Sequence, residues 1–147
     1  MSRRIAWILL GFVFVLFAGV ARAEMVSVSI KEANLRSGPG SNHPVQWKVI
    51  QGYPLEVVKR QGNWIQVRDF EKDVSWIYAQ SVNKSPYVIV TGDTVNLRAT
   101  PATSARIVDK VEYGTVMERL GLQGGWVKVR IGGTTGWISA NYVWGWK

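Results

Sequence analysis

Residues with the chemistry for catalysis are few in this 147-residue chain, and they are scattered. The only histidine, His43, lies in a polar loop, and no cysteine is present to act as nucleophile, thiolate ligand or disulfide partner. Asp69, Glu71 and Asp73 alternate through a predicted hairpin, but they lack the glycine and oxygen-ligand spacing of a calcium loop. A catalytic site needs an acid, base, nucleophile or metal in one constellation. We therefore predict no enzyme activity, no cofactor and no metal site.

Tryptophan on a polar strand face points to binding instead. Trp64 and Trp126 belong to two similar stretches, residues 62–68 and 124–130, in which apolar and polar residues alternate strictly. A period of two indicates a β-strand with one buried face. In each stretch the tryptophan shares the face of the polar residues, opposite the core. Such a tryptophan must be covered by a loop, by another domain or by a ligand.

An internal repeat organises the chain. A shift of 62 positions places Trp64 on Trp126, and one residue is lost later, in the last hairpin. The chain is therefore a tandem duplication with a short joint at residues 83–86. Further matched segments are Asn34-Leu35-Arg36 with Asn96-Leu97-Arg98 and Trp76-Ile77 with Trp137-Ile138.

Each repeat reads as a series of short strands separated by glycine-rich or polar turns, which is typical of a small all-β barrel or sandwich. For one strand the sequence does not decide which residues face the core. Leu55 and Val57 suit a core in the first repeat, but Arg119 replaces Val57 in the second, where Val116 and Leu120 are the alternative inward pair. In the second repeat we expect strands at residues 95–98, 106–111, 116–122, 126–131 and 135–139.

The first residues have the pattern of a secretory signal peptide. Ser2-Arg3-Arg4 is basic, residues 5–20 carry no charge, and Ala21-Arg22-Ala23 supplies a small-x-small cleavage pattern. Twin-arginine export is one alternative, but Ala6 and Trp7 fit its pattern poorly. An uncleaved anchor is the other, but the uncharged run is shorter than the roughly 18–20 residues of a spanning helix. We predict cleavage after Ala23 and export to the periplasm or cell envelope, with no stable membrane anchor afterwards.

The mature chain would then hold two domains, residues 24–84 and 85–147. Removal of the three leader arginines lowers the formal charge from +8 to +5. A mildly basic surface is compatible with anionic wall polymers, and equally with ordinary solvated strands and turns. Export argues against nucleic acid as a partner.

Three motifs resemble the bacterial SH3 (SH3b) family. They are the segment from Asn34 to Gly40, the pattern Gly-x-Trp-x-x-Val-Arg in both repeats, and Gly136-Trp137-Ile138 in the second. The first repeat departs from the family at Ser75, where a glycine is expected, and its preceding hairpin is longer and more charged. The resemblance implies two tandem SH3-like β-barrels of five or six strands, exported and binding cell-wall peptides. In many relatives such a module is attached to a wall hydrolase.

The end of the second repeat also resembles that of a eukaryotic SH3 domain, which implies groove residues. On that pattern Trp126 and Tyr142 are neighbours on a groove floor. The first repeat keeps Trp64 but has Ser81 in the position of Tyr142, so half of its aromatic platform is missing. We therefore expect the second barrel to be the better binder, with Trp64 secondary. The alternative is that Trp126 is buried against the first barrel.

Several neighbouring residues have two possible roles. Arg36 and Arg98 can meet a ligand carboxylate or cap the edge of the sheet. Asn34 and Asn96 are expected to bond the local backbone more than a ligand. The other tryptophans divide into Trp76 and Trp137, expected in the core or at its rim, and Trp47, Trp144 and Trp146, which either pack between the barrels or stay exposed.

The leading hypothesis is an exported, non-catalytic binding module that recognises peptide or peptidoglycan components through an aromatic groove. Extended peptides suit such grooves because they offer flat apolar surfaces and lose little entropy on binding. The alternative is a structural or adaptor protein that docks another cell-envelope protein. The groove residues predicted are Trp126, Tyr142, Trp64, Arg36 and Arg98.

Overall fold

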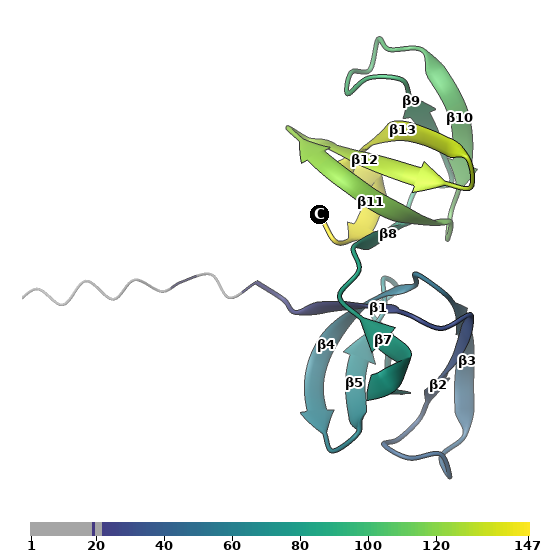
Figure 1. The fold of residues 1–147 in the computed structure, drawn as a ribbon, viewed down its shortest axis with the longest axis vertical. Coiled ribbons are helices and arrows are strands. Elements are labelled where there is room, and N and C mark those ends of the chain that lie inside the picture. The colour runs from purple at the N-terminus through teal and green to yellow at the C-terminus, as the bar shows by residue number, and fades with distance from the viewer. Residues whose placement is uncertain (1–18, 20–21) are drawn as a thin grey trace, which may run out of the picture.

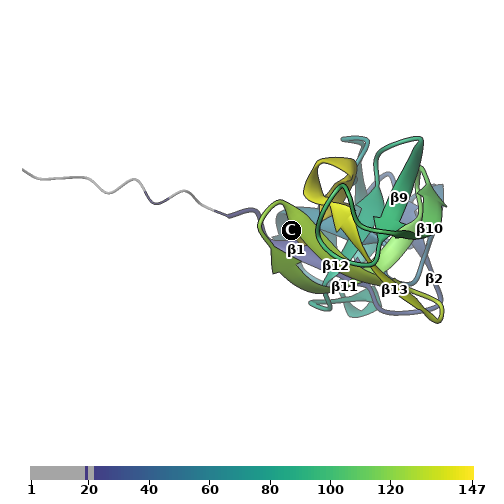
Figure 2. The ribbon, with the colours of Figure 1, turned by 90° about the horizontal axis from the view of Figure 1, so that it is seen from above.

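The computed structural model describes residue 19 and residues 22–147, and in that part it contains two antiparallel seven-stranded sheets. Each sheet curls into a small barrel, and the barrels are stacked along the long axis of the molecule (Figures 1 and 2). The all-β prediction is confirmed. Each sheet exceeds the expected five or six strands because a short last strand, after a 3-10 turn, pairs with the first strand.

The elements of the first barrel are β1 (Met25–Val28), β2 (Glu32–Arg36), β3 (Val45–Ile50), β4 (Pro54–Gln61), β5 (Trp64–Arg68), β6 (Val74–Tyr78), η1 (Ala79–Ser81) and β7 (Val82–Asn83). Those of the second are β8 (Tyr87–Val90), β9 (Thr94–Arg98), β10 (Ile107–Glu112), β11 (Val116–Gln123), β12 (Trp126–Ile131), β13 (Thr134–Ser139), η2 (Ala140–Tyr142) and β14 (Val143–Gly145).

The predicted signal peptide falls almost wholly on residues 1–18 and 20–21, outside the described residues, so its cleavage stays a prediction. In the part of the chain that the structure describes, no helix has the length and apolar character needed to cross a membrane.

Alternation along β5 and β12 places the two tryptophans as expected. Ile65 and Val67 are buried, whereas Trp64 lies half-buried on the opposite face. The same pattern recurs around Trp126 in β12. Each barrel has its own apolar core, formed by Val26, Val28, Ala33, Leu35, Val49, Leu55, Ile65, Val67 and Ile77 in the first and by Val88, Val90, Val95, Leu97, Val111, Met117, Val127, Val129, Ile138 and Val143 in the second.

A β-bulge in β4 and in its counterpart β11 decides which residues face inward. The register against the neighbouring strand shifts around Val58 in the first barrel and around Leu120 in the second. Before the bulge, Leu55 and its counterpart Met117 are the buried inward residues. The alternative inward pair, Val116 and Leu120, is wrong. Val116 lies on the outward face, and the extra residue of the bulge leaves Leu120 exposed at the surface.

The last hairpin keeps its strand register in both barrels although the connections differ. Ser75 and its counterpart Gly136 pair with equivalent valines, so the serine is buried without altering the pairing. The first barrel makes this connection through residues 69–73, with Lys72 in the left-handed region at φ 70. The second uses a glycine turn that begins at Gly132, with φ 54. Strand pairing therefore survives the departure from the family pattern.

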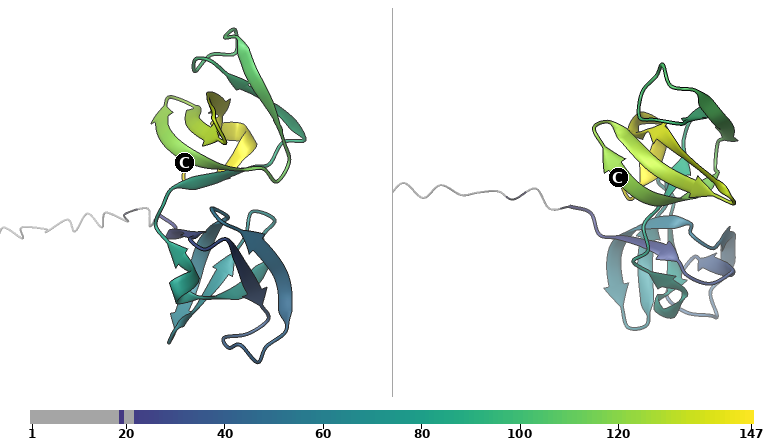
Figure 3. Two further views of the ribbon diagram at one scale, coloured as in Figure 1. Left: turned by 45° about the vertical axis from the view of Figure 1, so that its right-hand side comes forward. Right: turned by 45° about the horizontal axis from the view of Figure 1, so that its top comes forward.

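The outer faces of the first strands, β1 and β8, contribute to the junction between the barrels. Ser27 in β1 and Ile89 in β8 occupy equivalent repeat positions, and both are buried although they belong to neither barrel's core. The indole N–H of Trp146 donates a hydrogen bond of 3.0 Å to the Ser27 hydroxyl across the junction. Figures 1 and 3 show β8 and the C-terminal end on the side of the second barrel that faces the first.

An aromatic contact adds to this junction. The Phe70 ring lies 5.4 Å from the Tyr113 ring of the second barrel and 6.3 Å from the Tyr53 ring of its own. Aromatic pairs at such distances stabilise beyond the area that they bury. The last hairpin of the first barrel is thus part of the contact between the two domains.

The three tryptophans with open roles have different environments. Trp146 lies at the junction through its bond to Ser27. A cavity between the barrels is lined by both Trp144 and Trp146. Trp47, on strand β3, is 56% exposed. Trp76 is buried and Trp137 half-buried, in agreement with the expected core or rim positions.

Candidate functional site

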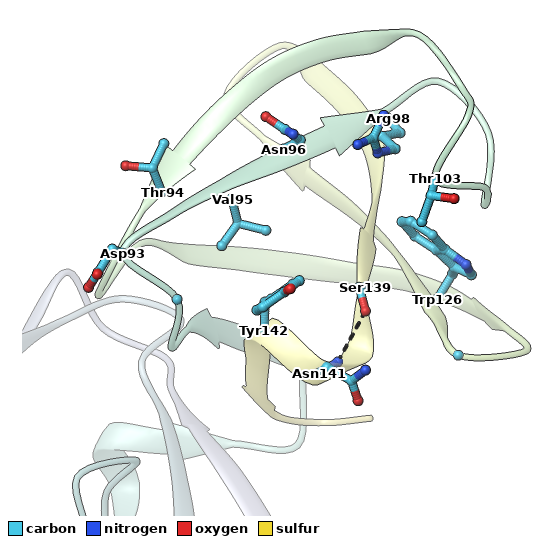
Figure 4. A pocket seen from close by; sticks show the side chains of 12 residues that line it. Asp93, Thr94, Val95, Asn96, Arg98, Thr103, Trp126, Ser139, Asn141 and Tyr142 are labelled. Carbon is cyan, nitrogen blue, oxygen red and sulfur yellow. Dashed lines mark hydrogen bonds between the residues drawn. The ribbon is translucent and has the colours of Figure 1, made fainter.

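A groove of about 660 Å³ opens on the second barrel, between β9, the loop that follows it and η2 (Figure 4). Strand β9 contributes Asn96 and Arg98, β12 contributes Trp126, and η2 contributes Tyr142. The turn before β12 contains Gly124 at φ 57, a conformation that glycine adopts without strain. This turn places Trp126 at the first position of its strand, at the edge of the groove.

Trp126 lies on a groove built only from second-barrel residues, not against the first barrel. It is half-buried, so part of its ring remains available to a ligand. Tyr142, which is 50% exposed, lines the same groove. In Figure 4 the two aromatic side chains lie apart, with Ser139 between them. Both residues line one groove, but the two rings are not the direct neighbours that the sequence pattern implies.

The first barrel has an equivalent groove of about 590 Å³. Trp64 lines it, and Ser81 stands in the position that corresponds to Tyr142. The missing tyrosine is nevertheless replaced, because Tyr78 from β6 lies beside Trp64 with the ring centroids 5.5 Å apart. The expectation that this barrel lacks half of its aromatic platform is therefore wrong.

Sequence reasoning missed Tyr78 because its counterpart in the second repeat is Ser139, which is not aromatic. The signal lay in strand pairing. Trp64 and Tyr78 are direct cross-strand partners in the β5–β6 hairpin. Side chains of such partners lie on the same face of a sheet and in contact.

Arg36 and Arg98 line the two grooves at equivalent positions, and each holds the loop that follows its strand. One guanidinium nitrogen of Arg36 donates to the backbone oxygens of Ser41, at 3.1 Å, and of His43, at 2.8 Å. Arg98 donates to the backbone oxygen of Ala105 at 2.9 Å. Both arginines therefore have a structural role, and both keep a part of the guanidinium in the groove.

Asn34 and Asn96 also line the grooves, two positions before the arginines. The expected bonds from their side chains to the local backbone are absent: among the described residues neither amide takes part in a hydrogen bond to another protein group. Both side chains are half-buried. Polar groups in that position need a partner from water or from a ligand.

The acidic hairpin is exposed at residues 71–73, whereas Asp69 at its base is buried and bonded to the turn backbone. The Asp69 carboxylate, which is buried, accepts hydrogen bonds from the backbone N–H groups of Glu71, at 2.9 Å, and Asp73, at 3.0 Å. Burial raises the pKa of the Asp69 carboxyl, against these two N–H bonds, which act to lower it. Within the described part of the chain no cluster of three or more histidine, cysteine or acidic side chains is arranged to hold a metal ion.

His43 is part of the structure of its loop. Its imidazole packs on Gly38, where a Cβ atom would lie 2.5 Å from the ring nitrogen Nδ1. A larger residue at position 38 would therefore displace the imidazole.

Comparison with known proteins identifies both halves of the chain. Two family descriptions, each of a bacterial SH3 domain, match residues 29–84 and residues 93–143. A Bacillus subtilis (strain 168) protein, YrvJ, provisionally named an N-acetylmuramoyl-L-alanine amidase, is 27% identical over 142 residues. That match covers 88% of this chain but only 27% of YrvJ, so the chain spans about a quarter of its relative.

Solved structures give weaker likenesses. An NlpC/P60 family protein from Bacillus cereus ATCC 10987 is 16% identical, with a TM-score of 0.38, over 82% of this chain and 56% of its own. NlpC2 from Trichomonas vaginalis is 13% identical, with a TM-score of 0.38, over 84% and 48%. The CBD of endolysin LysPBC5 is 17% identical, with a TM-score of 0.33, over 82% and 92%.

The assignment rests on the two family matches, which follow one another along the chain and each coincide with one barrel. The chain belongs to the bacterial SH3 domain family, of which it carries two copies in tandem.

Proposed function

We propose that this protein is an exported, non-catalytic binding protein whose two barrels recognise peptide or peptidoglycan components of the cell wall. The observation that carries the proposal is the repetition of one groove on both barrels. Each groove combines an accessible tryptophan, Trp64 or Trp126, with a tyrosine and an arginine. A relative named as an amidase of N-acetylmuramoyl-L-alanine, a wall component, supports the choice of ligand class.

The grooves suit an extended peptide. Trp126 and Tyr142 offer two apolar surfaces on one groove floor, and Arg98 and Asn96 supply hydrogen-bond donors along its wall. A bound peptide would place apolar groups on the rings and backbone carbonyls or carboxylates on the donors. Aromatic side chains are effective in this role because they bring a large contact area at a small cost in conformational entropy.

The predicted cleavage site lies just before the first residue that is bonded into the first barrel, which is consistent with export. The Glu24 carbonyl accepts a hydrogen bond of 2.8 Å from the Val57 backbone N–H, and its carboxylate pairs with Arg60. Cleavage after Ala23 would therefore leave the first barrel complete. The intact mass of protein recovered from the envelope fraction tests this, because retention of residues 1–23 would make the protein membrane-anchored.

Binding to the wall is tested by sedimentation with insoluble peptidoglycan at low and high salt. We expect the purified protein to pellet with the wall at both salt concentrations, since the aromatic contacts are not screened. The double variant Trp64→Ala/Trp126→Ala is the matched control and should stay in the supernatant. Retention of that variant, or retention at low salt only, would contradict recognition through the grooves. Release of soluble muropeptides would contradict the non-catalytic assignment.

A second candidate function is docking to another envelope protein, and one observation favours it. Strand β3 at the edge of the first sheet exposes Val45 (42%), Trp47 (56%) and Ile50 (58%), whereas Asp109 stands at the position equivalent to Trp47 in the second barrel. Exposed apolar edge strands favour association. Cross-linking in the envelope followed by recovery of one protein partner, lost in Trp47→Ala, would support this function over wall binding.

A further inference from the structure

Each groove is lined by a strand arginine that has no acidic partner among the described residues, whereas three other strand arginines have one. Arg60, Arg68 and Arg130 each form an ion pair with a glutamate. Among the residues that the structure describes, neither Arg36 nor Arg98 is within ion-pair distance of a carboxylate. Each groove therefore contains a guanidinium that no carboxylate of the described residues neutralises.

The guanidinium of each groove arginine is held in place while part of it stays free. Arg98 uses one nitrogen to bond the loop carbonyl of Ala105, and Arg36 uses one nitrogen for both of its loop carbonyls. The remaining N–H donors of each side chain have no protein acceptor among the described residues. A guanidinium whose rotamer is fixed loses little entropy on meeting a planar, two-oxygen acceptor, and carboxylate has that geometry.

The acidic residues of the grooves do not neutralise these arginines. Asp93, the acidic residue that lines the second groove, lies at the opposite end from Arg98 in Figure 4. Glu32, which lines the first groove, pairs with Lys48 at 3.4 Å. Each groove therefore keeps a positive charge at its arginine, Arg36 or Arg98.

The neighbouring asparagines extend the same recognition surface. Asn34 and Asn96 precede the arginines by two positions on the same strand face, and their amides have no protein partner in the described chain. A peptide end that meets the guanidinium through its carboxylate would present its last amide group to the asparagine. Its terminal side chain would then approach the indole of Trp64 or Trp126.

We propose that both grooves read the free terminal carboxylate of wall stem peptides, so that the protein prefers peptide ends that are not cross-linked. A cross-link converts the terminal carboxyl group of the donor peptide into an amide, which removes the charge that the arginine meets. This inference rests on the proposed wall-binding function and names the chemical end of the ligand. Arg36 and Arg98 are the specificity-determining residues.

The test compares two probes that differ in one group: a synthetic stem tetrapeptide with a free terminal carboxylate and the same peptide ending in a carboxamide. Each is titrated into the isotope-labelled protein, and the indole N–H signals of Trp64 and Trp126 report the two grooves separately. We expect the carboxylate peptide to bind about tenfold more tightly at each groove, the usual scale for a hydrogen bond to a charged group.

Variants separate two roles of the groove arginines: binding the ligand carboxylate and holding the neighbouring loop. In Arg36→Gln/Arg98→Gln the preference for the carboxylate peptide should disappear, because the charge that meets the carboxylate is gone. If the arginines only held the loops, their loss would weaken the binding of both peptides equally and the preference would remain. Lys72→Gln/Lys84→Gln, which removes two exposed positive charges outside the grooves, is the charge-matched control and should keep the preference. The comparison of the two peptides on the wild-type protein needs no variant, so the carboxylate preference can be tested even if a variant misfolds.

The outcomes are distinct. Equal binding of the two peptides, with both indole signals shifted, would overturn the carboxylate inference and leave wall binding intact. Carboxylate preference that survives in the arginine variant would overturn the role of Arg36 and Arg98. Failure of both peptides to bind, together with failure to sediment with peptidoglycan, would overturn the proposed function and this inference with it.

Discussion

The two grooves of this protein are built from the same repeat but complete their aromatic surface in different ways. Both place a tryptophan at the start of the equivalent strand and an asparagine and an arginine on the strand opposite. The second groove adds Tyr142 from η2, whereas the first adds Tyr78 from β6. A duplicated fold can thus preserve the composition of a site while the contributing element changes.

The difference changes the shape of the aromatic surface. Tyr78 contacts Trp64, so the first groove has one continuous pair of rings. Tyr142 lies apart from Trp126, so the second groove has two separate aromatic surfaces (Figure 4). Two separated surfaces can receive two side chains of a longer peptide. We therefore still propose that the second groove is the principal site and that Trp64 is secondary.

The largest expected effect is a loss of thermal stability when the two barrels are separated. This experiment tests whether each barrel, and with it each groove, depends on its neighbour. Residues 85–147 alone should melt roughly 10 °C below the tandem, because exposing Ile89 forfeits about 2 kcal/mol of burial. Residues 24–84 should lose less, since Ser27 is polar and water can replace the hydrogen bond from Trp146. Thermal melts of both halves and of the whole measure this.

Ile89→Ser gives the control for that experiment. It should destabilise the tandem and leave the isolated second half almost unchanged, because there the side chain already faces water. Identical melts for the halves and the tandem would mean that the barrels are independent, and the groove difference would then belong to each barrel alone.

Trp126→Ala tests the ranking of the grooves directly. We expect wall affinity to fall by about 2 kcal/mol, roughly thirtyfold, with little change in melting temperature, because this ring is half-buried on a groove and not in the core. Trp64→Ala should cost less. Sedimentation with peptidoglycan and thermal melts supply both measurements. A larger loss for Trp64→Ala would reverse the ranking, and unfolding by Trp126→Ala would remove the groove assignment.

Exchanging the tyrosine positions tests whether the source of the second ring matters. Tyr78→Ser copies the second barrel's residue into the first and should weaken the first groove about fivefold, since a partly exposed aromatic contact is lost. Adding Ser81→Tyr should restore binding and give the first groove the layout of the second. Titration monitored at the Trp64 indole measures each step. No recovery in the double variant would show that the position of the ring, and not its presence, sets affinity.

The smallest expected effect concerns the hairpins, which differ between the barrels. Asp69→Asn keeps an oxygen to accept the two backbone N–H bonds and removes a buried charge, so stability at neutral pH should be unchanged or higher by less than about 1 kcal/mol. Because the folded-state pKa of Asp69 is raised, its contribution to stability is present below the ordinary carboxyl pKa. That contribution is lost as pH rises through the raised value.

Denaturant melts across the acidic range, with wild type and Asp69→Asn side by side, measure that contribution. The variant should lack this part of the pH dependence. Asp69→Ala, which cannot accept the two bonds, should be less stable at every pH, and equal stability of the two variants would contradict the capping role.

Much of the fold followed from local pattern. Strict alternation around Trp64 and Trp126 predicted the buried and outward faces of β5 and β12, because neighbouring strand residues must point to opposite sides. The middle strands of the second barrel, β9 to β13, were predicted to within about two residues at each end, whereas β8 and β14, which pair with each other, were not among the predicted strands. The repeat itself predicted two domains of one kind.

The sequence by itself determined the repeat, the strand pattern, the family and which tryptophans leave the core, since each depends on residues near one another along the chain. Only the tertiary structure decided what covers those residues. It placed Tyr78 against Trp64 and buried Ser27 and Ile89 between the barrels. It also placed a bulge in β4 and in β11, which changes the residues that face the core after that point. The physical reason is that alternation assigns a side chain to a face, whereas pairing register, bulges and domain packing decide what lies across from that face.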